Sequence, residues 1–201
     1  MPYPDGKHSR AGAADLHKQD YIHRSLARVC LLYTLNALQE MIEKNGKYFK
    51  IAFSLSGVGS VMSYGSKPDG SSWQVAVTDP RDTEGDYLGV VALKGTEFLS
   101  TSGDYEKYFI EDGVRYHHIL DPSTGYPARS GLSSVTVVCD NGLDADGLST
   151  ACFVLGREKG EKLLEKYHAD GLFVDDSGHV WLTEGMKERF QLLKDTYSIS
   201  E

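Results

Sequence analysis

The chain lacks both the long apolar run of a membrane-spanning helix and the paired cysteines of a disulfide framework. No unbroken apolar run is longer than residues 29–33, whereas a membrane span needs roughly 18 such residues. The three cysteines, Cys30, Cys139 and Cys152, are odd in number and widely spaced. They fit neither a disulfide framework nor a C-x-x-C zinc site, so we expect free thiols in a reducing compartment.

Basic residues are also few. Lys and Arg total 21 against 29 Asp and Glu, which gives a formal net charge of -8. No basic stripe that could neutralise phosphates stands out, so nucleic acid is not expected as a partner. The first 20 residues contain no apolar stretch that could serve as a signal peptide and no lipid-attachment cysteine. The sequence as written therefore predicts a cytoplasmic protein with a mobile leader over residues 1–24.

What the chain does contain suits one folded domain over residues 25–201. It has 201 residues, of which 40% are hydrophobic and 25% charged, enough to bury a core. Alternating and β-branched segments predict strands. These are expected over residues 48–53, 73–77, 87–93, 97–100, 114–120 and 132–139, with a loop over 54–60, turns at 67–70 and 79–82, and a hairpin of 171–174 and 179–182.

Helical spacing of apolar residues predicts helices over 25–45, 144–156 and 157–168. Asp144 is expected to cap the second of these, and Gly156 to end it. Many antiparallel strands with a few helices indicate an α+β fold, an antiparallel sheet with helices packed on one side.

Three stretches combine turn chemistry with functional side chains, and the first covers residues 101–109. Its small residues let a ligand approach the backbone closely, and free N–H groups in such a turn can receive an anion. An ordinary turn that leads into an aromatic-rich strand accounts for the same residues.

The second stretch is the loop 118–125, whose shape is fixed by a proline and by Gly125, which permits a positive φ. Asp121 can hold this loop by accepting backbone N–H bonds. His118 can orient or deprotonate a hydroxyl near neutral pH, although a histidine at a strand end is more often structural. His117 and His118 point to opposite faces of a continuing strand, which disfavours a two-histidine metal site.

The third stretch covers residues 145–151. Asp146 and Thr150 are four residues apart, so their oxygens lie on the same face of a helix. A carboxylate plus a hydroxyl suits Mg²⁺, which prefers oxygen ligands and keeps sites for water and substrate phosphate. The alternative is that Asp146 favours the helix dipole and Thr150 bonds its own backbone.

Together and in this order, these stretches resemble the ApbE family, the FAD:protein FMN transferases, over about residues 34–186. The segments that carry the resemblance are residues 65–73, 79–81, 101–106, 118–127 and 145–156. The resemblance implies a T-fold-like α+β protein that binds FAD and Mg²⁺. It also implies transfer of FMN from FAD to a Thr or Ser hydroxyl of a partner protein, with release of AMP.

The resemblance also implies roles for individual residues. It makes Asp146 and Thr150 the metal ligands and His118 the catalytic group that activates or orients the acceptor hydroxyl. The positions expected beside the flavin cofactor are Ser102, Gly103, Asp104, His118, Ile119, Asp121, Thr124 and Gly125. A net-negative chain that handles a pyrophosphate needs a cation to neutralise developing charge, which agrees with this set.

The sequence departs from the family pattern mainly before residue 64. The family's I-A-K-G-Y motif is absent, with residues 25–30 in its place, and its S-L-G-G-N loop is lengthened over 54–60. In the third stretch, Gly147 stands where the family has alanine. We therefore expect a partial domain that lacks the N-terminal part of the family fold.

Two alternatives to transfer stay open at this stage. One is hydrolysis of FAD to FMN and AMP, with water in place of the acceptor hydroxyl. The other is a non-catalytic relative that keeps the fold and at most weak FAD or Mg²⁺ binding. A homodimer could cover apolar surface left exposed by the missing region. Family members are often exported, membrane-anchored lipoproteins, which the first 20 residues do not predict here.

Overall fold

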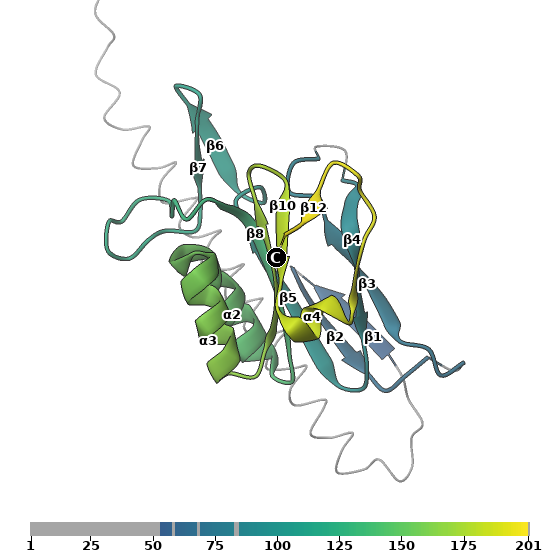
Figure 1. Cartoon of the computed structure of the whole chain (residues 1–201). Coiled ribbons are helices and arrows are strands. Elements are labelled where there is room, and N and C mark those ends of the chain that lie inside the picture. The colour runs from purple at the N-terminus through teal and green to yellow at the C-terminus, as the bar shows by residue number, and fades with distance from the viewer. Residues whose placement is uncertain (1–52, 58, 68, 83–84, 201) are drawn as a thin grey trace, which may run out of the picture.

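The computed structural model describes residues 53–57, 59–67, 69–82 and 85–200 (Figure 1). Its main element is a seven-stranded sheet in the order β1-β2-β5-β8-β9-β10-β12. Neighbouring strands are antiparallel except for the parallel pair β10 and β12. The strands are β1 (Phe53–Gly57), β2 (Ser60–Tyr64), β5 (Glu97–Gly103), β8 (Leu132–Cys139), β9 (Asp170–Asp175), β10 (His179–Leu182) and β12 (Ser198–Ile199).

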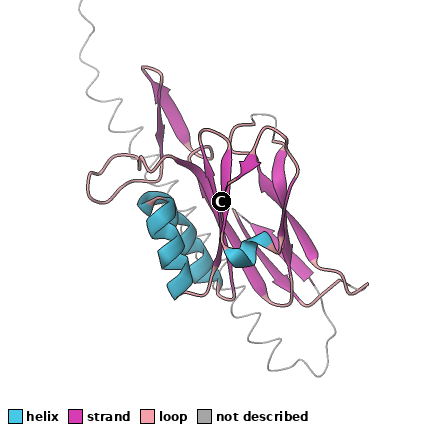
Figure 2. Cartoon of the chain, viewed as in Figure 1, coloured by secondary structure: helices cyan, strands magenta, loops and turns pink. Residues whose placement is uncertain are grey.

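Different layers cover the two faces of this sheet. Helices α2 (Gly142–Leu155) and α3 (Arg157–Lys166) cover one face (Figure 2). The other face packs against a three-stranded sheet in the order β11-β4-β3, together with Met186 of the short helix α4. These elements are β3 (Trp73–Thr78), β4 (Tyr87–Leu93), β11 (Phe190–Leu192) and α4 (Glu184–Lys187).

Strand β8 lies at the centre, and all its residues are buried. Because side chains alternate along a strand, Val135 and Val137 join the core on the helix side, whereas Val138 joins the core on the other side. The same alternation in β5 sends Phe98 toward the helices and Leu99 toward the small sheet. Even-numbered residues of β5 therefore face α2.

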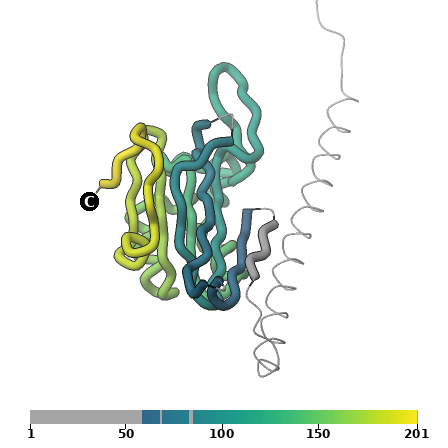
Figure 3. Tube along the Cα trace, turned by 90° about the vertical axis from the view of Figure 1, so that its right-hand side faces the viewer, coloured from purple at the N-terminus to yellow at the C-terminus, as the bar shows by residue number. Residues whose placement is uncertain are grey.

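A two-stranded hairpin of β6 (Tyr108–Glu111) and β7 (Val114–His117) projects beyond the main sheet (Figures 1 and 3). The stacked rings of Phe109 and Tyr116 support it across the strands. The hairpin delivers the chain directly to His118. It thereby connects the first two stretches that the sequence marks as functional.

The structure confirms the α+β class and the strands expected over 87–93, 132–139 and 179–182. It lengthens the strands expected over 73–77, 97–100 and 171–174 to 73–78, 97–103 and 170–175. In the segment 54–60, expected to be a loop, residues 54–57 belong to β1 and residue 60 begins β2, which pairs with β1. The segment 101–103, expected to be a turn, completes β5. Strands β2 and β5 each direct a buried serine toward the other, and the hydroxyl oxygens of Ser60 and Ser100 lie 3.1 Å apart. This hydrogen bond satisfies both buried hydroxyls.

Helix α2 begins earlier than Asp144, the expected cap. Asn141 is the N-cap, and its side-chain oxygen accepts from the backbone N–H of Leu143 at 2.9 Å and of Asp144 at 3.2 Å. Asn is among the preferred capping residues, and it precedes Asp144 in the chain. Gly156 ends α2 as expected, with a φ of 80°.

The strand expected over 114–120 ends at His117, because the following residues fold back into a loop. The helix expected over 25–45, most of the strand at 48–53 and the leader at 1–24 lie outside the described residues. Within the part of the chain that the structure describes, no helix is long and apolar enough to cross a membrane.

Replacing either of two helical glycines by alanine should change the free energy of unfolding, in opposite directions. A Cβ on Gly160 of α3 would lie 2.9 Å from the buried Phe173 ring and 3.1 Å from Cys152 Cβ, whereas a Cβ on Gly147 of α2 would meet nothing within 4 Å. We expect Gly147→Ala to raise the free energy of unfolding by up to about 1 kcal/mol. Gly160→Ala should lower it by about 1–3 kcal/mol through overpacking.

Urea denaturation of the two variants and the parent chain measures both changes. Gly147→Ala serves as the control for helix propensity, because it changes the same residue type without the close contact. A Gly160→Ala variant as stable as Gly147→Ala would contradict the tight packing of α3 on α2 and β9.

Candidate active site

The structure brings the first and third stretches together where the end of β5 faces α2, and it joins the second stretch to the end of the first. Ser102 of the first stretch lies 2.9 Å from Thr150 of the third, measured between hydroxyl oxygens. Lys107, at the end of the first stretch, accepts through its carbonyl from the backbone N–H of His118 at 3.1 Å. The ring of His117 packs on the ring of Phe153 in α2 with centroids 5.5 Å apart. Segments distant in sequence are thus in contact.

Buried hydroxyls form the contact between β5 and α2. Ser102 Oγ lies 2.9 Å from both Ser149 Oγ and Thr150 Oγ1. Ser100, two residues earlier on the same face of β5, donates to Asp146 Oδ1 at 3.3 Å. Ser100, Ser102 and Ser149 are all buried. The two expected metal ligands, Asp146 and Thr150, are thereby attached to the central sheet.

The alternative expected for Thr150, a bond to its own backbone, is present. Its hydroxyl donates to the Asp146 carbonyl at 3.4 Å, and the Ser149 hydroxyl donates to the same carbonyl at 3.0 Å. A hydroxyl has one proton and two lone pairs. Donation to the backbone therefore leaves Thr150 Oγ1 able to accept a hydrogen bond or to ligate a cation, so the two roles are compatible.

The oxygen donors at this place fit Mg²⁺ in chemical type. The half-buried Asp146 supplies a carboxylate, and the exposed Thr150 supplies a hydroxyl on the same face of α2. Among the described residues, no group of three or more His, Cys, Asp or Glu could hold a metal. Mg²⁺ is commonly bound through one or two carboxylates together with waters and substrate phosphates, so a single carboxylate suits a cation whose coordination a pyrophosphate completes.

The ring of His118 is oriented by the first stretch. Its Nδ1 lies 3.3 Å from the carbonyl oxygen of Lys107. Since a carbonyl can only accept, Nδ1 carries the hydrogen, and the lone pair of the neutral ring is on Nε2. Nε2 is then the nitrogen that can take a proton from a hydroxyl. This geometry suits the base role expected for His118.

The loop after His118 has the expected turn structure. Asp121 Oδ1 accepts from the backbone N–H of Ser123 at 2.8 Å and from its hydroxyl at 2.7 Å. The side-chain bond and then the backbone bond from Ser123 hold the pKa of Asp121 below its ordinary value. Gly125 has a φ of 74° and donates to the Asp121 carbonyl. Thr124 Oγ1 accepts from the Tyr126 N–H at 3.3 Å.

Two expected flavin-contacting residues have packing roles. Ile119 is 5% exposed and lies in the core on the helix side, so its side chain is directed away from solvent. A Cβ on Gly103 would collide with the ring of Tyr105. Gly103 therefore makes room for that ring, and any ligand contact of Ile119 would use its backbone.

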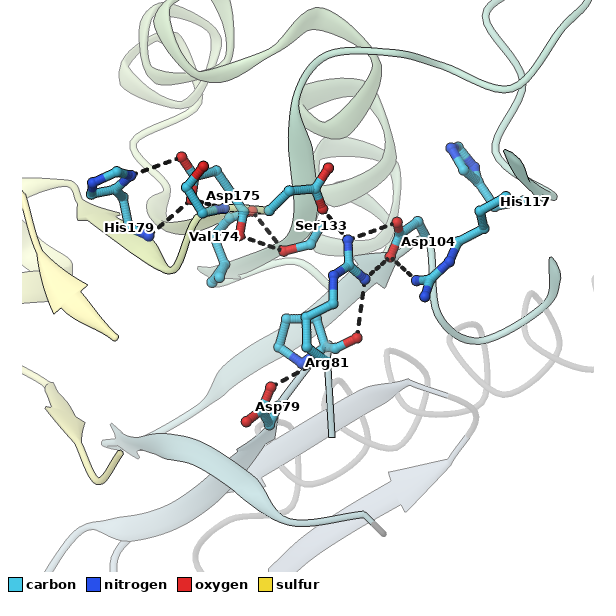
Figure 4. Close-up of polar contacts among 12 residues, drawn as sticks. Asp79, Arg81, Asp104, His117, Ser133, Val174, Asp175 and His179 are labelled. Atoms are coloured by element: carbon cyan, nitrogen blue, oxygen red, sulfur yellow. Dashed lines mark hydrogen bonds and ion pairs between the residues drawn. The ribbon is translucent and has the colours of Figure 1, made fainter. Parts of the chain in front are cut away.

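Asp104 is the centre of an ion cluster (Figure 4). Arg81 donates to both of its carboxylate oxygens, at 2.7 and 3.0 Å, and Arg115 donates to Oδ1 at 3.2 Å. Arg81 also pairs with Asp176, which follows β9. The cluster joins the end of β5 to the segment after β3. Asp104 is thus engaged by two guanidinium groups, which leave less of it open to a flavin.

A cleft of about 360 Å³ adjoins this cluster. It is lined by Asp79, Arg81, Asp82, Asp175, Asp176, Ser177, Gly178, Thr196 and Tyr197. None of the site residues expected from the sequence lines it. Arg81 connects the cleft to the candidate active site, because it lines the cleft and also binds Asp104 at the end of β5.

Asp79 anchors the wall of this cleft. Burial raises its pKa, but hydrogen bonds from Tyr197 at 2.5 Å, from Lys194 and from the Arg81 backbone N–H outweigh burial and hold the pKa below its ordinary value. The carboxylate is therefore charged and fully engaged. Its contacts are internal to the fold, which favours a structural role.

Several residues of the site have no role in the sequence-based set: Ser100, Ser149, Arg81, Arg115 and His117. The spacing of Ser100 and Ser102 was a usable signal, because residues two apart on a strand share a face. Ser149 could have been paired with Asp146 by its helical spacing of three residues. The partners of Arg81 and Arg115 are 23 and 11 residues away, and no local pattern indicates them.

Known proteins resemble this chain in sequence. The ApbE family pattern matches residues 33–173. A protein named FAD:protein FMN transferase from Treponema pallidum (strain Nichols) is 35% identical over 168 residues, which cover 83% of this chain and 45% of that protein. The protein of the same name from Salmonella typhimurium is 35% identical over 159 residues, 78% of this chain and 44% of its own length. The chain thus spans less than half the length of these relatives.

Solved structures agree with the sequence match. The crystal structure of the ApbE protein from Thermotoga maritima superposes with a TM-score of 0.69 at 37% identity, covering 81% of this chain and 52% of that one. The apo form of the flavinyl transferase ApbE from Pseudomonas stutzeri gives 0.60 at 37% identity, covering 78% and 49%. A family pattern that covers well over half of the chain, together with this shared fold, shows that the chain belongs to the ApbE family.

Proposed function

We propose that this chain carries the catalytic face of an Mg²⁺-dependent FAD:protein FMN transferase. The observation that carries the proposal is the contact of the β5 hydroxyls with the Asp146–Thr150 pair of α2. His118 is tied to the segment after β5 through the Lys107 carbonyl. A base and an oxygen-donor set for a cation are the groups that attack on a pyrophosphate requires. The relatives' names give the same reaction.

In this reaction the acceptor hydroxyl of a Thr or Ser attacks the phosphorus of the FMN half of FAD. His118 takes the hydroxyl proton at Nε2, while its Nδ1–H stays hydrogen-bonded to the Lys107 carbonyl oxygen. A new O–P bond forms, the pyrophosphate P–O bond breaks, and AMP leaves with the electron pair. A divalent cation at Asp146 and Thr150, when bound, supplies charge neutralisation for the pyrophosphate.

The other expected site residues shape the surroundings. Asp121, Thr124 and Gly125 hold the loop through internal hydrogen bonds. Ser102 orients Thr150, and Asp104 fixes the end of β5 through its two arginines. We propose that these residues support the site mainly by fixing its geometry, and that direct flavin contacts come from backbone groups of the same segments.

Hydrolysis of FAD and a non-catalytic fold are the competing functions. Hydrolysis needs the same base and cation and replaces only the acceptor. A non-catalytic relative would keep the fold and bind FAD or Mg²⁺ at most weakly. FAD and a protein that carries the acceptor hydroxyl are the proposed partners, and the homodimer and the cytoplasmic location stay predictions.

Incubation of the chain with FAD, Mg²⁺ and a flavin-acceptor protein tests the reaction. We expect covalent flavin fluorescence on the acceptor in a denaturing gel and an equal amount of AMP. His118→Ala should lower the rate by roughly 100-fold or more, because a positioned base contributes about 10²–10⁴. AMP without labelled protein would indicate hydrolysis. Neither product, with no FAD binding by titration, would establish the non-catalytic alternative.

The cation site makes a separate prediction. Asp146→Asn should raise the Mg²⁺ concentration for half-maximal transfer by at least about 10-fold, and it should weaken Mn²⁺ binding measured by calorimetry in the presence of FAD. Asp144→Asn is the matched control, since Asp144 is an exposed carboxylate in the first turn of the same helix. Equal Mn²⁺ affinity in the two variants would show that Asp146 holds no cation.

A further inference from the structure

His117 is buried where its neighbour His118 is partly exposed. It ends β7, is 5% exposed, and places Nε2 3.0 Å from the carbonyl oxygen of Ala128. Because a carbonyl only accepts, Nε2 carries the hydrogen and Nδ1 carries the lone pair. Within the described part of the chain, Nδ1 has no hydrogen-bond partner. Burial lowers the pKa of His117, so the ring is neutral at neutral pH.

The bond from His117 to Ala128 closes the base of the loop that carries His118. Ala128 also donates its backbone N–H to the Ile119 carbonyl at 2.9 Å. A β-bridge between Leu120 and Pro127 lies one step further into the loop. The carbonyl and the N–H of Ala128 are thus both held by residues that flank His118 in sequence.

The His117 ring also attaches the base of the loop that carries His118 to α2. The His117 and Phe153 rings meet edge to face, with planes at 86°. Phe153 is 1% exposed and follows Thr150 by three residues, one turn of the helix. One side chain therefore links the chain next to the proposed base with the helix that holds the proposed cation ligands.

We propose that His117 is a positioning residue for flavin transfer, which sets the place of His118 relative to Thr150 by donating to the Ala128 carbonyl and packing on Phe153. This inference rests on the proposed function of the same site. It gives the two consecutive histidines separate tasks. His118 exchanges a proton with the acceptor hydroxyl, and His117 holds the loop against α2.

The unpartnered Nδ1 argues against a purely stabilising role for His117. A buried acceptor without a partner costs free energy. An aromatic ring without nitrogen would remove that cost and keep the edge-to-face contact, but it would lose the hydrogen bond to Ala128. His117→Phe is therefore expected to fold, with thermal stability near that of the parent chain, while the loop base loses one of its ties.

A pair of variants separates the two functions of the ring. His117→Phe keeps the aromatic contact and removes the donor, whereas His117→Gln can restore a donor at the position of Nε2. We expect His117→Phe to lower kcat roughly 10- to 100-fold, since small displacements of a catalytic group have effects of this size. The KM for FAD should change less than about threefold, and His117→Gln should recover most of kcat.

Two measurements need no turnover. Nitrogen-15 NMR of the histidine rings should show His117 protonated at Nε2 alone. Hydrogen exchange should be faster at the amides of Gly125 and Ala128 in His117→Phe than in the parent chain or in His117→Gln. If the parent chain transfers no flavin, the proposed function fails, and the exchange data still decide whether His117 ties the loop.

The inference is overturned by any of three results. His117→Phe could keep parental kcat and parental exchange, which would show that the donor does not fix the loop. His117→Gln could restore parental exchange and still lose as much kcat as His117→Phe, which would show that tying the loop does not position His118. A His117 ring protonated at Nδ1 would exclude the bond to Ala128.

Discussion

The hydroxyl contact between β5 and α2 is the constraint on which the site depends. Ser100 and Ser102 enter an interface that is otherwise apolar, and buried hydroxyls need partners. They find them on α2, in Asp146, Ser149 and Thr150. A shift of the helix by one residue would break these pairs and leave hydroxyls unsatisfied, at a cost of about 1–3 kcal/mol each. This hydroxyl contact, the seam between β5 and α2, therefore fixes the positions of Asp146 and Thr150 as well as the packing of α2.

Around this seam, the end of β5 joins all the layers of the fold. Asp104, the next residue after β5, is held by Arg81, which follows β3 of the small sheet, and by Arg115 from the projecting hairpin. The His117 ring returns the chain after that hairpin to α2. The loop with His118 is thus attached to both partners of the seam. Under the proposed function, these attachments would give a base on this loop the precision of a base on a regular element.

Local chemistry could be predicted from the sequence, and long-range partners could not. The alternation of side chains predicted strand β8. The tendency of an aspartate to accept hydrogen bonds from its own sequence neighbours predicted the turn at Asp121. The predictions of secondary structure are wrong where a contact with a residue far away in the sequence determines the local structure. Residues 101–103 have the small side chains of a turn, yet they complete β5 because they pair with residues 134–136 of β8. Ser102 also meets α2 at Thr150, 48 residues away. The Tyr105 ring occupies the space that a Cβ on Gly103 would need, and the place of Gly103 beside a flavin stays a prediction.

Under the proposed function, the hydroxyl cluster would let one set of residues serve both folding and cation binding. Ser149 and Thr150 both donate to the Asp146 carbonyl, so neither needs the single proton of Ser102. Ser102 can direct that proton to Ser149 or to Thr150, since both oxygens are 2.9 Å away. When it points to Ser149, the lone pairs of Thr150 Oγ1 stay available. Under the proposed function, rotation of one buried hydroxyl would then be enough to admit a cation, and no buried polar group would lose its partner.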